Sequence, residues 1–196
     1  LLANCLEQLR NISGAVEQLR AAAQIQPGNA TADINLARLL ITQGDTSGAH
    51  DQLTHLDAKT LTPDDRQRAA GLYARLGDPA AASSLLAAGP DLDPAATLML
   101  AKLYVQQQDF TKADGLVSKL LARPDPAIIR FAANLYLSEN KPAEAQAAIA
   151  KLDALAAGPG VADVVRAQYL LRLGKTADGL AQYKTAIKAA DRKSGV

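Results

Sequence analysis

Residues 63–90 read PDDRQRAAGLYARLGDPAAASSLLAAGP, and this stretch decides the fold. Apolar residues recur three and four positions apart on both sides of the Gly-Asp-Pro interruption, which is typical of two amphipathic helices. Gly77 can adopt the left-handed conformation that ends a helix, Asp78 can cap the next helix, and Pro79 suits a first helical turn. The stretch therefore predicts a helix, a tight turn and a second helix.

The same pattern recurs along the whole chain every 31 to 34 residues. A small residue marks the second helix of each copy, and these anchors are Ala15, Ala49, Ala82, Ala113, Ala145 and Gly179. A second small residue lies twelve positions before each anchor and marks the first helix: Ala3, Ala37, Ala70, Ala101, Ala133 and Ala167. Six helix-turn-helix units are expected, at approximately residues 1–29, 30–62, 63–93, 94–125, 126–159 and 160–193.

The composition favours packed helices and excludes several functions. Of the 196 residues 48% are hydrophobic, but five Tyr, two Phe and no Trp leave the core to small and aliphatic side chains. The net charge of +1 argues against nucleic-acid binding. No stretch approaches the roughly 18 to 20 consecutive apolar residues that a membrane-spanning helix needs. The single Cys5 cannot form an internal disulfide and does not indicate a compartment.

The repeat resembles the tetratricopeptide repeat family in its length, its small residues and the large residue three after the first small one. The large residues three positions after the small residue of each first helix are Leu6, Leu40, Tyr73, Tyr104, Tyr136 and Leu170. The resemblance implies an all-α, right-handed α-solenoid of about six units that forms one domain over residues 1–196. Counting back from Ala15 places Leu1 inside a first helix, so the first unit is expected to be truncated, with Cys5 as a small core residue.

The resemblance also implies a non-catalytic scaffold that binds other proteins or extended peptides through a concave groove lined by the first helices. The exposed first-helix positions give the candidate partner-binding residues Asn4, Asn35, Arg38, Arg68, Arg75, Lys102, Arg130, Asn134, Gln168 and Arg172. Asp64 is an acid at these positions, but basic and amide residues predominate there, so the lining favours an acidic or extended peptide. Arg38, Arg68, Arg75, Lys102 and Arg130 are expected to form the binding stripe. The alternative, an ordinary solvated surface, stays open.

No catalytic, cofactor-binding or metal-binding residue is expected, and the chain is not expected to be an enzyme. His50 and His55 lie five residues apart, about 140° around a helix, so they do not make the usual metal-binding pair. Gly158-Pro159-Gly160 lacks the lysine of a phosphate loop and is expected to be a bend between units. The three tyrosines at the shared repeat position are expected in the core.

The richness in Ala, Gln and Asp resembles that of tetratricopeptide arrays in bacterial envelope proteins that export exopolysaccharide, such as the tetratricopeptide component of cellulose synthase, or in repeat lipoproteins. This resemblance implies a scaffold in the periplasm. One alternative is a cytoplasmic adaptor or co-chaperone that binds an acidic peptide. Co-chaperones that grip a C-terminal carboxylate use two lysines where this chain has Leu1 and Asp64, which argues against that form of binding. Another alternative is the docking or regulatory region of a larger enzyme.

Overall fold

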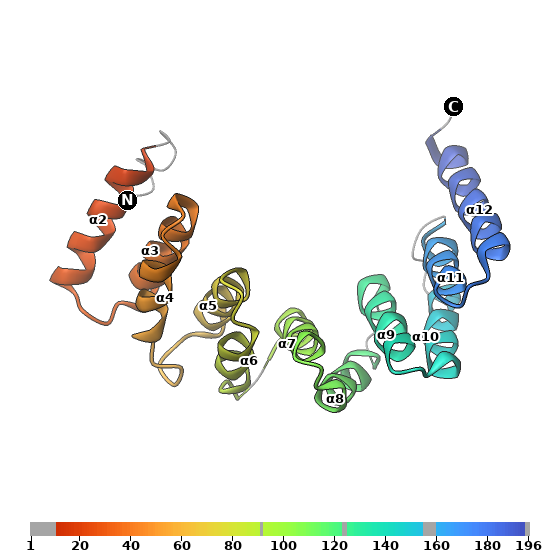
Figure 1. The fold of residues 1–196 in the computed structure, drawn as a ribbon, viewed down its shortest axis with the longest axis horizontal. Helices are drawn as coiled ribbons and strands as arrows, with labels where there is room; N and C mark the ends of the chain where they lie inside the picture. The colour runs from red at the N-terminus through yellow and green to blue at the C-terminus, as the bar shows by residue number, and fades with distance from the viewer. Residues whose placement is uncertain (1–10, 91, 123–124, 155–159, 195–196) are drawn as a thin grey trace. The chain divides into compact units, whose positions relative to one another are not determined.

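The computed structural model describes residues 11–90, 92–122, 125–154 and 160–194. In these residues the backbone forms eleven α-helices and no strand (Figure 1). The helices are α2 (Ile12–Ile25), α3 (Ala30–Gln43), α4 (Thr46–Thr54), α5 (Pro63–Arg75), α6 (Pro79–Ala87), α7 (Pro94–Gln106), α8 (Phe110–Leu120), α9 (Pro126–Ser138), α10 (Pro142–Ala154), α11 (Val161–Arg172) and α12 (Thr176–Ser194). The predicted all-α class is confirmed.

The chain divides into two compact units, Leu1–Gln107 and Gln108–Val196. Unit 1 contains α2 to α7, and unit 2 contains α8 to α12. Within them, consecutive helices pack as hairpins: α3 with α4, α5 with α6, α9 with α10, and α11 with α12. The first helices of neighbouring hairpins also pack together, α3 with α5 in unit 1 and α9 with α11 in unit 2. A single domain of six units stays a prediction.

Aspartate side chains fix where three of the second helices begin, and for Asp78 this is the cap that the sequence predicts. The Asp45 carboxylate accepts a hydrogen bond from Gly48 N at 2.9 Å, and Asp78 accepts one from Ala81 N at 2.8 Å. Asp109 accepts one from Lys112 N at 3.2 Å. First helices use the same device, with Thr62, Asp93 and Asp125 as caps before a proline in the first turn. Each cap satisfies an amide that the helix leaves without an internal partner.

Left-handed residues end several helices. Gly44, Gly77 and Gly174 have φ angles of 86°, 80° and 74°, and Asn140 has a φ of 58°; for Gly77 this is the conformation that the sequence predicts. Gln108 is a poor match to this role in the sequence, yet its φ is 61° and it occupies the same place after α7. The turn between α7 and α8 therefore holds a side chain in a backbone conformation that disfavours it.

The core lies along the small anchors. Ala15, Ala49, Ala82, Ala113 and Ala145 are each 0% exposed, which lets paired helices approach closely. Branched side chains then fill the space between the hairpins, and the largest fully buried ones include Ile34, Leu36, Leu39, Leu40, Leu53, Leu86, Ile129 and Leu135. Residues 1–10, with Cys5, lie outside the described residues, as does most of the predicted Gly158-Pro159-Gly160 bend.

The three tyrosines at the shared repeat position differ in burial. Tyr73 is a core residue with 7% of its surface exposed, as predicted. Tyr104 and Tyr136 are only half-buried, so for them the core prediction is too strong. Burial, with Asp114 as a further cause, still raises the pKa of the Tyr136 phenol.

Candidate protein-interaction surface

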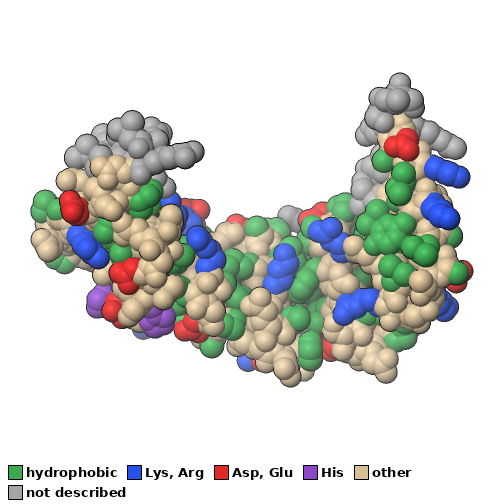
Figure 2. Space-filling model, turned by 45° about the horizontal axis from the view of Figure 1, so that its top comes forward, with side chains coloured by type: hydrophobic (Ala, Val, Ile, Leu, Met, Phe, Trp, Pro, Cys, Tyr) green, Lys and Arg blue, Asp and Glu red, His purple; other side chains and the backbone are tan. Residues whose placement is uncertain are grey.

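The exposed sides of paired first helices form one surface in each unit, named here the first-helix face. In unit 1 it is built from α3 and α5, and in unit 2 from α9 and α11. The structure places the predicted partner-binding residues on α3 (Asn35, Arg38), α5 (Arg68, Arg75), α7 (Lys102), α9 (Arg130, Asn134) and α11 (Gln168, Arg172). Asn4 lies outside the described residues. In Figure 2 the Lys and Arg side chains stand apart, separated by hydrophobic and uncharged surface.

Arg68 links two hairpins of unit 1. Its Nη2 donates a hydrogen bond to Asn35 Oδ1 at 2.6 Å, from α5 to α3. Its Nη1 lies 3.2 Å from Asp65 Oδ1 and 4.0 Å from Asp64 Oδ2. Because an amide oxygen and two carboxylates surround the guanidinium, much of its charge is balanced within the chain.

Asp65 is the acid in this network that the sequence analysis missed. Its side chain is 12% exposed, although it is next in sequence to the exposed Asp64. Thr62 Oγ1 donates to Asp65 at 3.0 Å, and Thr31 Oγ1 of the preceding hairpin donates at 3.3 Å. The Thr62-to-Asp65 spacing at the start of α5 is the sequence signal that could have identified it, since N-cap threonines pair with acids three residues later.

A second arginine–asparagine pair links two hairpins of unit 2. Arg172 Nη1 on α11 donates to Asn134 Oδ1 on α9 at 3.2 Å and to Asn134 O at 3.4 Å. This pair is more exposed than the pair in unit 1. In each unit the polar first-helix residues therefore bind one another, and the predicted basic stripe is weaker than its residue count indicates.

The other predicted partner-binding residues differ in their exposure and in whether they interact within the chain. Arg38 is half-buried and Lys102 exposed, and both interact within the chain. Arg75 and Arg130 are exposed, one in each unit, and Gln168 is half-buried. Of these residues, Arg130 borders a pocket between α9 and α11.

A pocket opens between α9 and α11 on the first-helix face of unit 2. Its volume is about 330 Å³. Pro126, Ala127 and Arg130 of α9 line one side, and Val164 and Val165 of α11 line the other. Of its described lining residues, four are apolar and Arg130 is the charged one.

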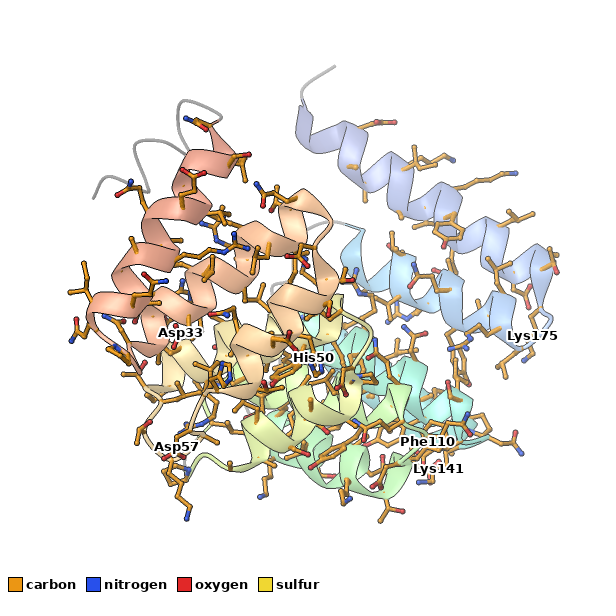
Figure 3. All side chains as sticks on the ribbon, turned by 60° about the vertical axis from the view of Figure 1, so that its left-hand side comes forward. Asp33, His50, Asp57, Phe110, Lys141 and Lys175 are labelled. Carbon is orange, nitrogen blue, oxygen red and sulfur yellow. The ribbon has the colours of Figure 1, made fainter. Side chains whose placement is uncertain are left out.

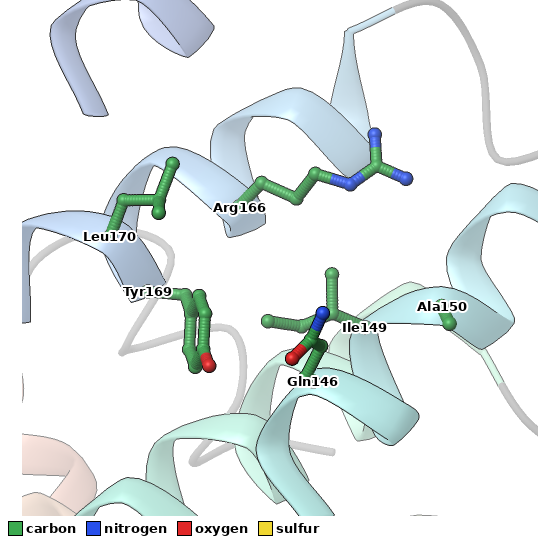
Figure 4. A pocket seen from close by; sticks show the side chains of 6 residues that line it. All are labelled: Gln146, Ile149, Ala150, Arg166, Tyr169 and Leu170. Carbon is green, nitrogen blue, oxygen red and sulfur yellow. The ribbon is translucent and has the colours of Figure 1, made fainter. Parts of the chain in front are cut away.

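A second pocket of unit 2 lies between α10 and α11 (Figure 4). Its volume is about 280 Å³, and Gln146, Ile149, Arg166 and Tyr169 contribute to its lining. Arg166 occupies a repeat position at which the preceding units have the buried Leu36, Ala69, Leu100 and Ala132. A charged side chain cannot close this interface as an aliphatic one does, and Arg166 Nη1 lies 3.5 Å from Asp163 Oδ1 instead.

The two histidines lie apart from the first-helix faces. His50 lies on α4 (Figure 3). It packs edge-on against Tyr73 with ring centroids 5.7 Å apart, and its Nε2 lies 3.6 Å from Asp78 Oδ2. His55 is exposed beyond the end of α4. Burial raises the pKa of the Asp33 carboxyl, and the field of His55 offsets only part of this rise.

A charged cluster lies at the turn between α9 and α10. Lys141 Nζ lies 2.7 Å from Asp114 Oδ2 and 3.0 Å from Glu139 Oε1 (Figure 3). Hydrogen bonds to Asp114 and Glu139 raise the pKa of Lys141 well above its usual range. The cluster joins α8 to the next hairpin within unit 2, so its arrangement is that of a structural ion-pair network.

Metal-ligand sets and membrane-spanning helices are both missing from the part of the chain that the structure describes. In residues 11–90, 92–122, 125–154 and 160–194, no three His, Cys, Asp or Glu side chains gather as a ligand set for a metal ion. No helix in the same residues combines the length and the apolar character needed to cross a bilayer.

Comparisons with known proteins agree with this architecture. Residues 6–76 match the family model described as tetratricopeptide repeat. The fold is that of a tetratricopeptide repeat protein. A comparison with curated proteins gives no significant match.

Solved structures extend the similarity over nearly the whole chain. The C-terminal part of a TPR repeat-containing protein from Cytophaga hutchinsonii is 14% identical with a TM-score of 0.70, and 98% of this chain aligns with 79% of that one. PilF from Pseudomonas aeruginosa is 19% identical with a TM-score of 0.63, over 93% and 85% of the two chains. PilW, a type IV pilus biogenesis factor, is 15% identical with a TM-score of 0.63, over 92% and 87%. At these identities the similarity shows the fold alone.

Proposed function

We propose that the chain is a non-catalytic scaffold that binds other proteins through its first-helix faces. The observation that carries the proposal is that both faces present long polar side chains that pack into no core. Side-chain caps fix the start of α3, α5 and α9, which favours a surface that recognises a partner without first being ordered. Repeat folds of this type commonly use such extended surfaces for binding.

The chemistry of the faces favours an extended segment of a partner protein. Asparagine and glutamine side chains can hydrogen-bond to a partner's backbone, and exposed Arg75 and Arg130 can bind carboxylates. The internal pairing of Arg68 and Arg172 lowers the positive field of both faces. A partner with a few well-placed acids therefore fits better than a polyanion, and nucleic acid is not part of the proposal.

We propose that the chain works in the periplasm, as part of a bacterial envelope assembly that synthesises or exports a cellulose-type exopolysaccharide. Two observations support it: the Ala-, Gln- and Asp-rich composition, and the similarity of the fold to PilW, a type IV pilus biogenesis factor. A cytoplasmic adaptor or co-chaperone for an acidic peptide and a docking region of a larger enzyme are the competing settings, and the partners captured by the chain distinguish them.

The test is a crosslinking pull-down from the source cell with three forms of the chain. The first is the wild type, and the second carries Arg75→Glu and Arg130→Glu, which reverse one exposed charge on a first helix of each unit. The third is a matched control with Lys119→Glu and Lys151→Glu, which reverse exposed charges on second helices.

We expect the Arg75→Glu, Arg130→Glu form to lose partners that the wild type and the control retain. Capture of envelope or polysaccharide-synthesis proteins supports the periplasmic setting, whereas chaperones or a catalytic subunit support the competing ones. Identical capture by all three forms would overturn binding through the first-helix faces.

A further inference from the structure

The pocket between α9 and α11 has a floor and a rim of different character. Val165 forms the floor and is 4% exposed, so it is part of the core of unit 2. Pro126 and Val164 are half-buried at the sides, and Ala127 and Arg130 are exposed at the opening. An apolar side chain that enters from solvent would therefore bury its surface against valine and proline, which is favourable in proportion to the area buried.

The charge at the rim indicates what would accompany that apolar side chain. In the described residues, no hydrogen bond or ion pair engages the Arg130 side chain. The two described acids nearest to the lining residues in sequence have other partners: Asp125 accepts a hydrogen bond from Ala127 N at 2.7 Å and so caps α9, and Asp163 lies 3.5 Å from Arg166. Among the described residues that line the pocket, Arg130 is thus the cation available to an incoming carboxylate, which a guanidinium can bind with two hydrogen bonds.

The surface continues from the pocket along both helices. Asn134 is four residues after Arg130 on α9, and Gln168 is four residues after Val164 on α11, so each lies on the same helical side as its pocket residue. Their amide groups can hydrogen-bond to a partner's main chain. This sequence of groups, an apolar pocket, a cation and then amides, suits an extended peptide better than an isolated small molecule.

We propose that this pocket holds an aliphatic side chain of an extended partner segment, with an adjacent acidic residue of that segment bound by Arg130. The proposal rests on the function proposed above and gives it a ligand class. The site belongs to unit 2 alone and requires no particular arrangement of unit 1.

The probe for this site is a short fluorescein-labelled peptide with Asp-Leu at the centre of a Gly/Ser sequence, titrated into the full chain and followed by fluorescence anisotropy. Matched peptides carry Asn-Leu, Asp-Ala or Lys-Leu at the same place. We expect Asp-Leu to bind at least about tenfold more tightly than each of the other three, which is about 1.4 kcal/mol.

Two variants of the chain test the two halves of the site. Ala127→Leu fills the pocket from an exposed helical position, and Arg130→Gln removes the charge while keeping an amide. Ala143→Leu is the matched control, because Ala143 follows the first-turn proline of α10 as Ala127 follows that of α9, and both are exposed. Lys119→Gln is the control for charge, because Lys119 is exposed on the second helix α8 of the same unit.

We expect each pocket variant to weaken Asp-Leu binding by about tenfold and each control to leave it unchanged. We also expect Arg130→Gln to bind Asp-Leu and Asn-Leu equally. Absence of Asp-Leu binding, or equal binding by Ala127→Leu, overturns the proposal. The pull-down distinguishes failure of this site from failure of the scaffold function. If the Arg75→Glu, Arg130→Glu form loses partners that Ala127→Leu retains, the scaffold function stands and the pocket is not the binding site.

Discussion

Arg68 on α5 donates a hydrogen bond to Asn35 on α3 with an Nη2–Oδ1 distance of 2.6 Å, so a residue pair on the first-helix face connects two successive hairpins. Arg172 and Asn134 make the corresponding connection in unit 2 at 3.2 Å. Both pairs join side chains that the repeat pattern marks as partner-binding. These residues therefore contribute to the packing of one hairpin against the next as well as to the surface.

The two pairs differ in strength, and double-mutant cycles measure the difference. For Arg68→Ala and Asn35→Ala we expect a coupling of about 0.5–1 kcal/mol, which allows for the partial exposure of the guanidinium. For Arg172→Ala and Asn134→Ala we expect less, roughly 0.3 kcal/mol, because the pair is exposed and its hydrogen bond is longer. Urea unfolding of the single and double variants provides the data. Couplings of zero for both pairs would mean that neither connects its hairpins energetically.

Arg66 supports a different part of unit 1. It is 4% exposed, and its Nη2 donates to Ala58 O at 2.9 Å and Leu61 O at 3.1 Å, which fixes the loop between α4 and α5. We expect Arg66→Leu to destabilise the chain by about 2–3 kcal/mol in urea unfolding, because two carbonyl groups lose a charged donor. A loss below about 0.5 kcal/mol would show that water replaces the guanidinium without cost.

Gly89 provides an independent check on Arg66. A Cβ atom at Gly89 would lie 2.6 Å from Arg66 Nη1, so Gly89→Ala must displace the guanidinium. We expect this variant to cost about 1–2 kcal/mol and the cost to vanish in the Arg66→Leu background. Gly115→Ala in α8 is the control, since nothing lies within 4 Å of its Cβ position, and it should stabilise by about 0.5–1 kcal/mol. An equal cost of Gly89→Ala in both backgrounds would contradict the contact.

The sequence predicts the helices better than it predicts the first-helix faces. Caps such as Asp78 and left-handed residues such as Gly77 act over three or four positions, so their effect can be inferred from local sequence. The pairing of Arg68 with Asn35 depends on residues 33 positions apart, on the angle between two helices and on rotamers. The burial of Arg66 next to the exposed Asp64 has the same origin, whereas Asp65 has a local signal, its spacing from Thr62, which the repeat pattern does not include.

The turn after α7 contains a backbone conformation that the sequence does not favour. Gln108 has a φ of 61°, which costs a non-glycine residue roughly 1 kcal/mol. We expect Gln108→Gly to stabilise the chain by about 0.5 kcal/mol in thermal or urea unfolding. The control is Gln106→Gly, at the end of helix α7, where glycine should instead destabilise by up to about 1 kcal/mol. Destabilisation by both variants would contradict the left-handed assignment.

The start of α8 should respond to acid. The side-chain hydrogen bond from Lys112, with an ion-pair distance of 2.7 Å, lowers the pKa of Asp109, and the Lys112 backbone amide adds to this effect. A carboxyl whose pKa is lower in the folded state stabilises that state fully above its unfolded pKa of about 3.9. This stabilisation disappears as the pH falls through the lower, folded value.

Asp109→Asn isolates this contribution, because asparagine retains the capping role without the charge. We expect the wild type to unfold at a higher temperature than the variant at pH 7, and the difference to disappear near pH 2. Lys112→Gln should reduce the same difference by removing the partner. A difference between wild type and Asp109→Asn that stays constant from pH 7 to pH 2 would contradict the ion pair.

The caps have a consequence for how the chain folds. Asp45, Asp78 and Asp109 each accept a hydrogen bond from the backbone amide three residues later, which sets where a helix begins. The boundaries of a hairpin are therefore determined by residues of that hairpin. Chains dominated by such short-range contacts cross a low entropic barrier and fold quickly. A whole hairpin could then be inserted or removed by recombination while its neighbours keep their boundaries, because each interface requires only the next hairpin.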